Sequence, residues 1–342
     1  MKAFLITKFG SPSVLKISEV PERALEDREV RVAVRFIGLN FAEVFARLGI
    51  YPGIPDPPFI PGIEFSGIVK ETGVGVRAFK PGERVMGFCR QGSYAESVCV
   101  HEDHLVKIPR RMSLSEAAAF PVAFLSAFHG LVTLAHARRG EKLLLHAAAG
   151  GVGLAAIQIA RHLGLEIFAT AGSQEKLLAA EREGAHHVIN YRSEDFTVLV
   201  KRDTGGYGVD VVLDSVGGSI FRKSWKLLAP MGRYVLYGFA SVTGKGGLNR
   251  LKMIKEAVQV PLIYPPSIVS RNVSLMGFNL YFLTHKVQYF KGATKQLLSW
   301  YDKKIITPRI GTTFPFAEIP RAHEFLQSRK SIGKVVVEVP YT

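Results

Sequence analysis

The sequence predicts an α/β protein of two parts, a barrel-like β domain followed by a doubly wound parallel sheet. Residues 1–120 hold short strand candidates separated by Gly and Pro, and closely spaced strands with turn signals are typical of small barrels. From Gly140 onward, strand and helix patterns alternate, which favours a parallel sheet with helices on both faces. A glycine-rich turn after the first strand of that second part is the strongest single motif.

The composition is that of an ordinary globular protein. A length of 342 residues exceeds one typical core and favours two domains. The net charge of +15 is compatible with a phosphate-bearing cofactor, an anionic membrane surface or nucleic acid, but a solvated basic surface is the interpretation we favour. Basic residues are spread along the chain without a nucleic-acid motif, so we expect no specific nucleic-acid partner.

Two features bear on the compartment. Cys89 and Cys99 are the only cysteines, too few for a disulfide scaffold, which favours the reducing cytoplasm. Met1–Gly10 has only a very short apolar run, between Lys2 and Lys8, so we expect a first strand there and not a signal peptide.

The first part is predicted as strands and two helices. Ser113 and Glu116 form a capping pattern that starts one helix, and a second helix is expected over residues 123–135. With the boundary near Pro121, the predicted domains are 1–120 (completed by 306–342) and 121–305. The expected strands are 2–7, 29–38, 63–72, 84–88, 93–100 and 105–108.

In the second part of the sequence, predicted strands and helices alternate along the chain. Residues 241–270 interrupt it with a basic, proline-flanked stretch, which we expect to be an inserted helix and loop. A helix at 319–328 and a strand at 333–339 follow, and the last strand would return to the first domain. The expected strands are 142–146, 166–171, 187–190, 209–214, 233–238 and 272–278, and the expected helices begin near 152, 173, 194, 219 and 286.

The turn Ala147–Gly153 joins an apolar strand to a helix on which Val152, Ala156 and Ile159 recur at helical spacing. Leu143–Ala160 has no charged residue, but glycines in mid-segment and the change from strand to helix period exclude a membrane span. Glycines here let the backbone approach a diphosphate, which the helix N-terminus attracts. The segment therefore predicts a dinucleotide site.

The sequence also resembles the quinone oxidoreductase branch of the medium-chain dehydrogenase/reductase superfamily. Within that branch, Met231–Gly238 and Gly277–Leu280 are most similar to homologues of the synaptic-vesicle amine transport protein. The resemblance implies a split GroES-like catalytic domain, a Rossmann domain and a homodimer. It is carried by 38-GLNF, 61-PGIEFSG, 81-PGERV, 92-GSYAE, 147–153, 187-HVINY, 214-DSVG and 333-GKV.

We expect no metal, on chemical grounds. Zinc-dependent members of the superfamily carry a catalytic Cys and a Gly-His-Glu motif, and a catalytic zinc needs three N, S or O ligands. The matching tripeptide here is Gly62-Ile63-Glu64, and isoleucine offers no lone pair. Residues 39–41, where the first ligand would lie, contain no thiol.

The expected cofactor is NADPH. The second strand of the parallel sheet ends Ala171-Gly172-Ser173 without the Asp or Glu that binds the ribose hydroxyls of NAD. Lys176 could bind a 2′-phosphate, although a surface lysine is its simpler interpretation, and Glu175 could instead select NADH. By resemblance, further contacts extend to the nicotinamide end. The predicted cofactor residues are Ala149, Gly150, Gly151, Val152, Gly172, Ser173, Lys176, Tyr191, Val216, Tyr237, Gly238, Phe278, Asn279, Leu280 and Lys334.

The resemblance implies hydride transfer to a quinone or an α,β-unsaturated carbonyl. Asn40 is the first candidate for a polar group at the nicotinamide or substrate oxygen, and Tyr51 the second. Each has a structural alternative, since Asn40 could hold a loop and Tyr51 could pack against the prolines of 52–61. A rival function is a vesicle- or membrane-associated nucleotide-binding protein with little turnover, supported only by the basic insert 241–260.

Overall fold

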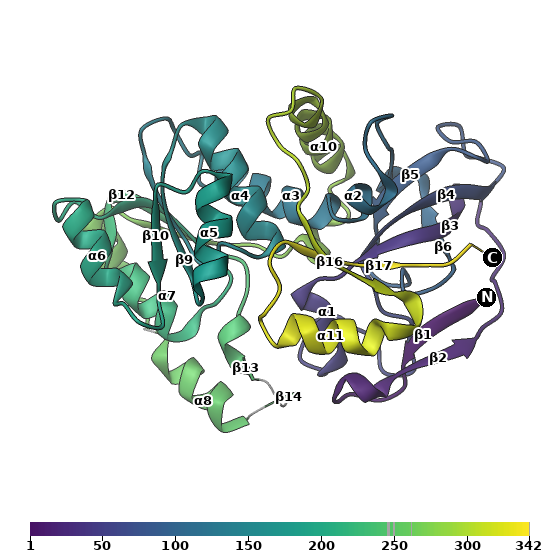
Figure 1. Ribbon diagram of the computed structural model, residues 1–342, viewed down its shortest axis with the longest axis horizontal. Coiled ribbons are helices and arrows are strands. Elements are labelled where there is room, and N and C mark those ends of the chain that lie inside the picture. The colour runs from purple at the N-terminus through teal and green to yellow at the C-terminus, as the bar shows by residue number, and fades with distance from the viewer. Residues whose placement is uncertain (245–246, 249, 261, 342) are drawn as a thin grey trace.

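The chain folds into two lobes that lie side by side, with both termini in the same lobe (Figure 1). The computed structural model describes residues 1–341 except 245–246, 249 and 261. The predicted Lys245 of the basic insert therefore lies outside the described residues. Among the described residues, no helix combines the length and apolar character needed to cross a membrane.

The first lobe is built on a seven-stranded sheet, as expected of a GroES-like domain. Strand β17 pairs antiparallel with β3, so the C-terminal strand returns to the first lobe as predicted. Helices α1 (Phe41–Arg47) and α11 (Ile319–Gln327) lie beside this sheet. The sheet order is β16 (Ile310–Pro315), β17 (Lys334–Glu338), β3 (Glu29–Gly38), β4 (Glu64–Thr72), β5 (Arg84–Phe88) and β7 (Leu105–Lys107), with β6 (Ser97–His101) also on β3 and a separate β1 (Lys2–Ile6)–β2 (Leu15–Glu19) pair.

The second lobe is a six-stranded parallel sheet, which confirms the predicted doubly wound fold. In sheet order its strands are β10 (His187–Asn190), β9 (Glu166–Ala171), β8 (Lys142–Leu145), β11 (Val209–Asp214), β12 (Leu228–Leu236) and β15 (Ser274–Gly277). Numbered along the chain this is 3-2-1-4-5-6, the Rossmann order. The order reverses between β8 and β11, and ligands bind outside the carboxyl ends of strands at such a point.

Helices cover both faces of this sheet. Gly164 and Gly184 end α4 and α5 in the left-handed conformation (φ 76° and 112°), which glycine adopts without a Cβ penalty. The helices are α4 (Gly151–Leu163), α5 (Gln174–Glu183), α6 (Phe196–Asp203), α7 (Gly218–Trp225), α8 (Arg250–Gln259), α9 (Pro265–Arg271) and α10 (Val287–Asp302), after α2 (Leu114–Ala118) and α3 (Pro121–Phe128).

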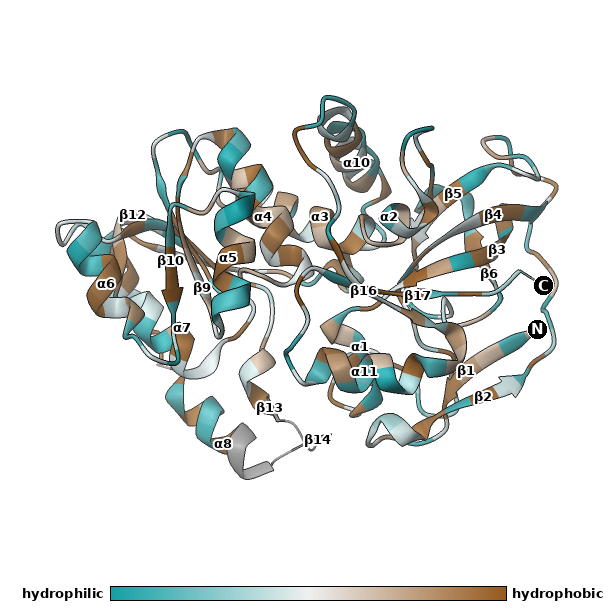
Figure 2. Cartoon of the chain, viewed as in Figure 1, coloured by the Kyte–Doolittle hydropathy of each residue, from teal (hydrophilic) through white to brown (hydrophobic). Residues whose placement is uncertain are grey.

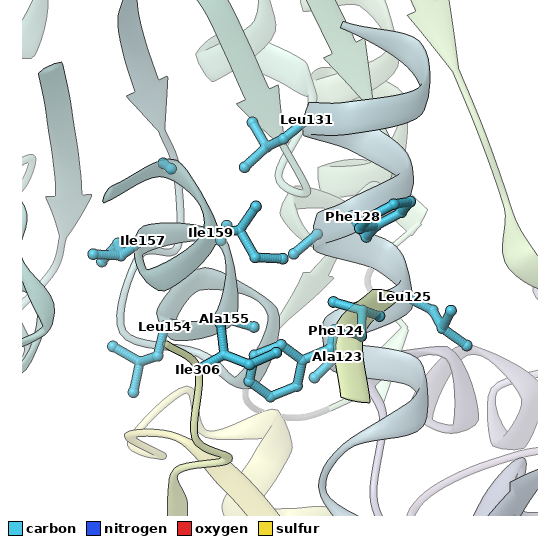
Figure 3. Packing of buried hydrophobic residues seen from close by; sticks show 14 of the residues in the cluster. Ala123, Phe124, Leu125, Phe128, Leu131, Leu154, Ala155, Ile157, Ile159 and Ile306 are labelled. Carbon is cyan, nitrogen blue, oxygen red and sulfur yellow. The ribbon is translucent and has the colours of Figure 1, made fainter. Parts of the chain in front are cut away.

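The buried strands explain the continuous apolar runs in the sequence. Leu143, Leu145, Val211 and Leu213 are fully buried, because helices cover the sheet on both sides. Figure 2 shows the hydrophobic colour on strands of this sheet, whereas α5 and α8 carry broad hydrophilic bands. Helix α3 and the π-helical segment that follows it pack against α4 through Phe124, Phe128, Leu131, Ala155 and Ile159, with Ile306 beside them (Figure 3).

Two predicted elements differ from the observed ones, and one observed strand was not predicted. The expected helix 123–135 divides into α3 and a π-helical segment, His129–Leu134. The expected helix after Ser219 ends at Trp225, and β12 already begins at Leu228, where it pairs with Val209 across a register irregularity. Strand β2 was not predicted, because its one buried residue, Leu15, gives no alternating pattern.

Candidate functional site

The turn between β8 and α4 has the geometry of a diphosphate cradle. Gly150 is the N-cap of α4, and the first N–H groups of the helix, from Gly151, lack intrahelical acceptors. A Cβ on Gly153 would lie 2.3 Å from the carbonyl oxygen of Ala148, so this position requires glycine. Ala147 has a φ of 53°, a strained conformation for a residue with a Cβ. The turn fits a dinucleotide diphosphate.

The C-terminal segment, which belongs to the first lobe, contacts this turn of the second lobe. The Gly333 amide donates to the Ala149 carbonyl at 2.8 Å, and Gly150 forms a parallel bridge with Gly333. The aliphatic part of Lys334 lies against Gly151, where a Cβ would be 3.2 Å from the Lys334 Cδ. The cradle is therefore assembled from both lobes.

Cationic side chains converge at the carboxyl end of β9. Lys176 Nζ donates to the Arg329 carbonyl at 2.5 Å, and a Cβ on Gly172 would lie 2.7 Å from the Tyr191 hydroxyl and 3.0 Å from Arg192 Nε. Burial lowers the pKa of Lys176, and the guanidiniums of Arg192 and Arg329 lower it further. Positive charges held this close to one another suit a phosphate group.

Sequence reasoning missed Arg192 and Arg329 in this cluster. Arg192 directly follows the predicted Tyr191, so its position was a usable signal. Arg329 comes from the segment after α11, and only the fold brings it to β9. Glu175, the residue that could have selected NADH, has an exposed side chain.

The predicted nicotinamide end lies at the carboxyl ends of β11, β12 and β15. The Tyr237 and Phe278 rings are stacked, with centroids 5.5 Å apart. The Tyr237 amide donates to the Asp214 carbonyl at 2.9 Å, and a Cβ on Gly238 would be 2.8 Å from the Ser215 carbonyl oxygen. These contacts bring together the predicted residues Tyr237, Gly238 and Phe278. Val216 follows Ser215 in the chain, and Asn279 and Leu280 follow Phe278.

Asn40 lies in a buried cluster where the two lobes meet. Its Nδ2 donates to Glu64 Oε1 at 2.8 Å, and its Oδ1 accepts from Lys334 Nζ at 2.6 Å. Lys334 also forms an ion pair with Glu64, whose Oε2 accepts from the Val122 amide at 2.9 Å. Lys334 was predicted to reach the cofactor phosphate. In this structure the Lys334 ammonium contacts Glu64 and Asn40. Its contact with the cofactor phosphate stays a prediction.

Glu43 ties the Asn40 backbone to the barrel. Its carboxylate accepts from the Asn40 amide at 2.7 Å, the Tyr94 hydroxyl at 2.8 Å and the Ile63 amide at 3.0 Å. Burial outweighs these donors and raises the pKa of Glu43 to about 7. Tyr94 is in turn 2.9 Å from His323 Nε2. No local sequence pattern indicated this network, which joins α1, the residue before β4 and α11.

The second candidate, Tyr51, bridges the lobes. Its hydroxyl donates to Asn279 Oδ1 at 2.9 Å, and the Tyr281 hydroxyl donates to the Gly53 carbonyl at 2.9 Å. Burial raises the pKa of Tyr51 to about 12, so its hydroxyl stays protonated as a hydrogen-bond donor. Tyr51 thus contacts a predicted nicotinamide residue, while its contact with substrate stays a prediction.

The cluster around Glu64 does not resemble a metal centre. Glu64 faces an ammonium and two N–H donors, which occupy the lone pairs a metal would need. Over the described ranges, no three His, Cys, Asp or Glu side chains group as metal ligands.

The comparisons with known proteins agree with this geometry. Residues 26–110 match the alcohol dehydrogenase GroES-like domain family, and residues 183–337 match the zinc-binding dehydrogenase family. Quinone oxidoreductase-like protein 2 of Bos taurus is 37% identical over 99% of this chain and 92% of its own. The human synaptic vesicle membrane protein VAT-1 homolog is 33% identical over 98% of this chain and 86% of its own.

A solved structure supports the same family. Escherichia coli quinone oxidoreductase complexed with NADPH has a TM-score of 0.88 at 30% identity, covering 99% of this chain and 100% of that one. The two-lobed fold and the glycine turn define a dinucleotide-dependent oxidoreductase. The chain belongs to the medium-chain dehydrogenase/reductase family, in its quinone oxidoreductase branch.

Proposed function

We propose that the protein is an NADPH-dependent, zinc-independent reductase of quinones or α,β-unsaturated carbonyls. One observation carries the cofactor assignment. The glycine turn and the cationic cluster of Lys176, Arg192 and Arg329 lie at the carboxyl ends of adjacent strands, β8 and β9. A diphosphate on the turn would place the adenosine 2′-phosphate toward that cluster.

When bound, NADPH supplies the hydride, and the protein provides binding, orientation and exclusion of water. Gly150, Gly151 and Val152 would hold the diphosphate, and Ser173, Lys176 and Tyr191 the 2′-phosphate. Phe278 and Tyr237 would pack at the nicotinamide end, beside Asn279. The Tyr51 hydroxyl, which donates to Asn279 here, would turn to donate its one hydrogen bond to the substrate oxygen instead, while solvent supplies the proton.

Zinc independence is supported by the Asn40 cluster. Lys334 already neutralises the Glu64 carboxylate, and its positive charge would repel a metal cation at that carboxylate. Lys334 and Glu64 hold the two polar atoms of the Asn40 side chain. Asn40 would therefore act on the substrate oxygen indirectly, by keeping Lys334 and the edge of the site in place.

The activity assay tests the proposal directly. NADPH oxidation is followed at neutral pH against ortho- and para-quinones, long-chain enones and aldehydes, with and without a zinc chelator. We expect turnover of at least one quinone or enone, unchanged by the chelator. NADPH binding without oxidation across the panel, or loss of activity on chelation, would contradict the proposal.

We further propose a cytoplasmic homodimer. Strand β15 is the outer strand of the six-stranded sheet, and within the described chain nothing pairs with its free edge. Leu275 on β15 and Val269 on α9 are 39% and 76% exposed, as an interface would require. Sedimentation velocity should give twice the chain mass, and Leu275→Lys should shift it toward the monomer.

A second candidate function is peripheral membrane attachment with little turnover. Ile254, Val258 and Leu262 are 62%, 78% and 99% exposed, and Lys255 lies beside them. Several relatives are named as synaptic vesicle membrane proteins. Salt-sensitive cosedimentation with anionic liposomes, together with no NADPH oxidation, would favour this function over the reductase.

A further inference from the structure

Aromatic side chains from both lobes meet beside the predicted nicotinamide end. The Tyr51 and Tyr281 rings are T-shaped, with centroids 5.5 Å apart, and the Phe282 ring packs against Tyr281 in the same way at 5.3 Å. Tyr51 belongs to the first lobe, whereas Tyr281 and Phe282 lie in the 3₁₀ helix Leu280–Leu283 that follows β15. We call these three residues the aromatic rim.

Hydrogen bonds hold the aromatic rim across the two lobes. The Tyr51 hydroxyl donates to Asn279 Oδ1 at 2.9 Å, and the same oxygen accepts from the Tyr281 amide at 3.0 Å. The Tyr281 hydroxyl reaches back to the Gly53 carbonyl at 2.9 Å. Because Asn279 is a predicted nicotinamide residue, the rim lies next to the place where a substrate would be reduced.

The sheet of the first lobe places Arg90 at the same region. Strand β5 pairs antiparallel with β4, so its last residue, Phe88, lies opposite Glu64. The Cys89 amide then donates to the Ile63 carbonyl at 2.8 Å, which keeps the chain beyond β5 beside the residue that precedes β4. Arg90 therefore follows the end of β5 that lies nearest the buried Glu64 carboxylate.

The Arg90 guanidinium lies over the Tyr281 ring, with Cζ 4.6 Å from the ring centroid. This cation–π contact orients the guanidinium on the rim, and it takes up no oxygen acceptor. The N–H donors of the guanidinium can therefore serve an anion, and their planar fork matches the two oxygens of a carboxylate.

The aromatic rim runs from the interior toward solvent. Tyr51 is half-buried, Phe282 is 45% exposed, and the Arg90 side chain is exposed. A substrate with its reacting carbon beside Tyr51 would lie along the aromatic faces and extend outward past Tyr281. A carboxylate on its outer part would meet the guanidinium of Arg90 there.

We propose that Arg90 is a specificity-determining residue that favours substrates with a carboxylate on the part that extends away from the reacting carbon. The guanidinium would donate two parallel hydrogen bonds to that carboxylate. Arg90 does not touch the reacting atoms, so it affects substrate binding more than hydride transfer. The inference deepens the proposed function and rests on it, because it takes Tyr51 and Asn279 as part of the reduction site.

Matched substrate pairs test the proposal. One pair is a benzoquinone whose alkyl side chain ends either in a carboxylate or in the methyl ester of that acid, and the second pair is an enone with the same two side chains. Steady-state kinetics with saturating NADPH compare the wild type with Arg90→Gln and Arg110→Gln. Arg110 is the matched control, because it is also an exposed arginine and lies near the opposite end of β5, where its carbonyl accepts from Arg84.

We expect Arg90→Gln to lower the ratio of kcat/KM for the acid to kcat/KM for the ester about fivefold. The change should come from a higher KM for the acid, with little change in kcat. The ratio cancels any difference in intrinsic reactivity within a pair. Arg90→Lys should give an intermediate ratio, since it keeps the charge and loses the planar fork. Arg110→Gln should leave the ratio unchanged.

The outcomes separate this inference from the proposed function. An unchanged ratio in Arg90→Gln, or an equal fall in Arg110→Gln, would overturn the inference and leave the reductase activity standing. If the wild type oxidised NADPH with none of the four compounds, the proposed function would fail. Calorimetric titration of the wild type and Arg90→Gln with acid and ester would then decide the inference: weaker binding of the acid alone in Arg90→Gln would support it, and any other result would overturn it.

Discussion

The two ends of the candidate site are built in different ways. At the nucleotide end, the cradle is main chain at the start of one helix, contributed by consecutive residues 147–153. At the reaction end, Asn40 is held by Glu64 and Lys334, which lie 24 and 294 residues away along the chain. The comparison teaches that the diphosphate cradle depends on the main-chain geometry of one short segment, whereas the reaction end depends on charged partners brought together by the fold.

The largest expected effect is on the stability of the reaction end. Lys334→Met leaves the Glu64 carboxylate buried without its cation, and we expect a loss of about 3–5 kcal/mol in the free energy of unfolding. Denaturant unfolding measures it. In the double variant Lys334→Met/Glu64→Gln we expect much of that loss to be recovered. Strictly additive losses would show that the pair is not coupled.

The next effect concerns pH. Burial raises the pKa of Glu43 from 4.5 to about 7 in the folded protein. Between pH 4.5 and pH 7 the native state therefore binds more protons than the unfolded state. Its contribution to stability therefore falls as pH rises from 4.5 to 7, by up to about 3 kcal/mol. As pH rises from 4.5 to 7, the free energy of unfolding of the wild type should fall relative to that of Glu43→Gln. Glu181→Gln, which removes an exposed carboxylate, should show no such trend.

At the nucleotide end, Gly153→Ala should weaken NADPH binding. The added Cβ would lie 2.3 Å from the Ala148 carbonyl oxygen, so the turn must shift, and we expect about a 100-fold higher dissociation constant. Fluorescence titration measures it. Gly292→Ala on α10 is the control, since nothing lies within 4 Å of its added Cβ. Equal affinity in the two variants would exclude the turn as the cradle.

The smallest effect separates the two nicotinamide cofactors. Lys176→Glu places a carboxylate beside Arg192 and Arg329, and we expect the Michaelis constant for NADPH to rise at least about tenfold, with little change for NADH. Lys201→Glu, an equal charge change on the exposed face of α6, should affect neither. A similar rise for both cofactors would remove Lys176 from the phosphate site.

Sequence alone predicted the fold and the local half of the site. The period-two and period-3.6 patterns and the glycine turn are local signals, so β8, α4 and a parallel sheet followed from them. The partners of Asn40, the bridge from Tyr51 to Asn279 and the approach of Arg329 to Lys176 join residues far apart in the chain. No local pattern reports such contacts, so they could not be predicted from the sequence.

A crystal structure of the protein with NADPH tests the central claim most directly. The account predicts the diphosphate on the amides of residues 150–152 and the 2′-phosphate among Lys176, Arg192 and Arg329, with Glu64 still paired to Lys334. An empty turn under saturating NADPH, or a zinc ion bound beside Asn40, would contradict it.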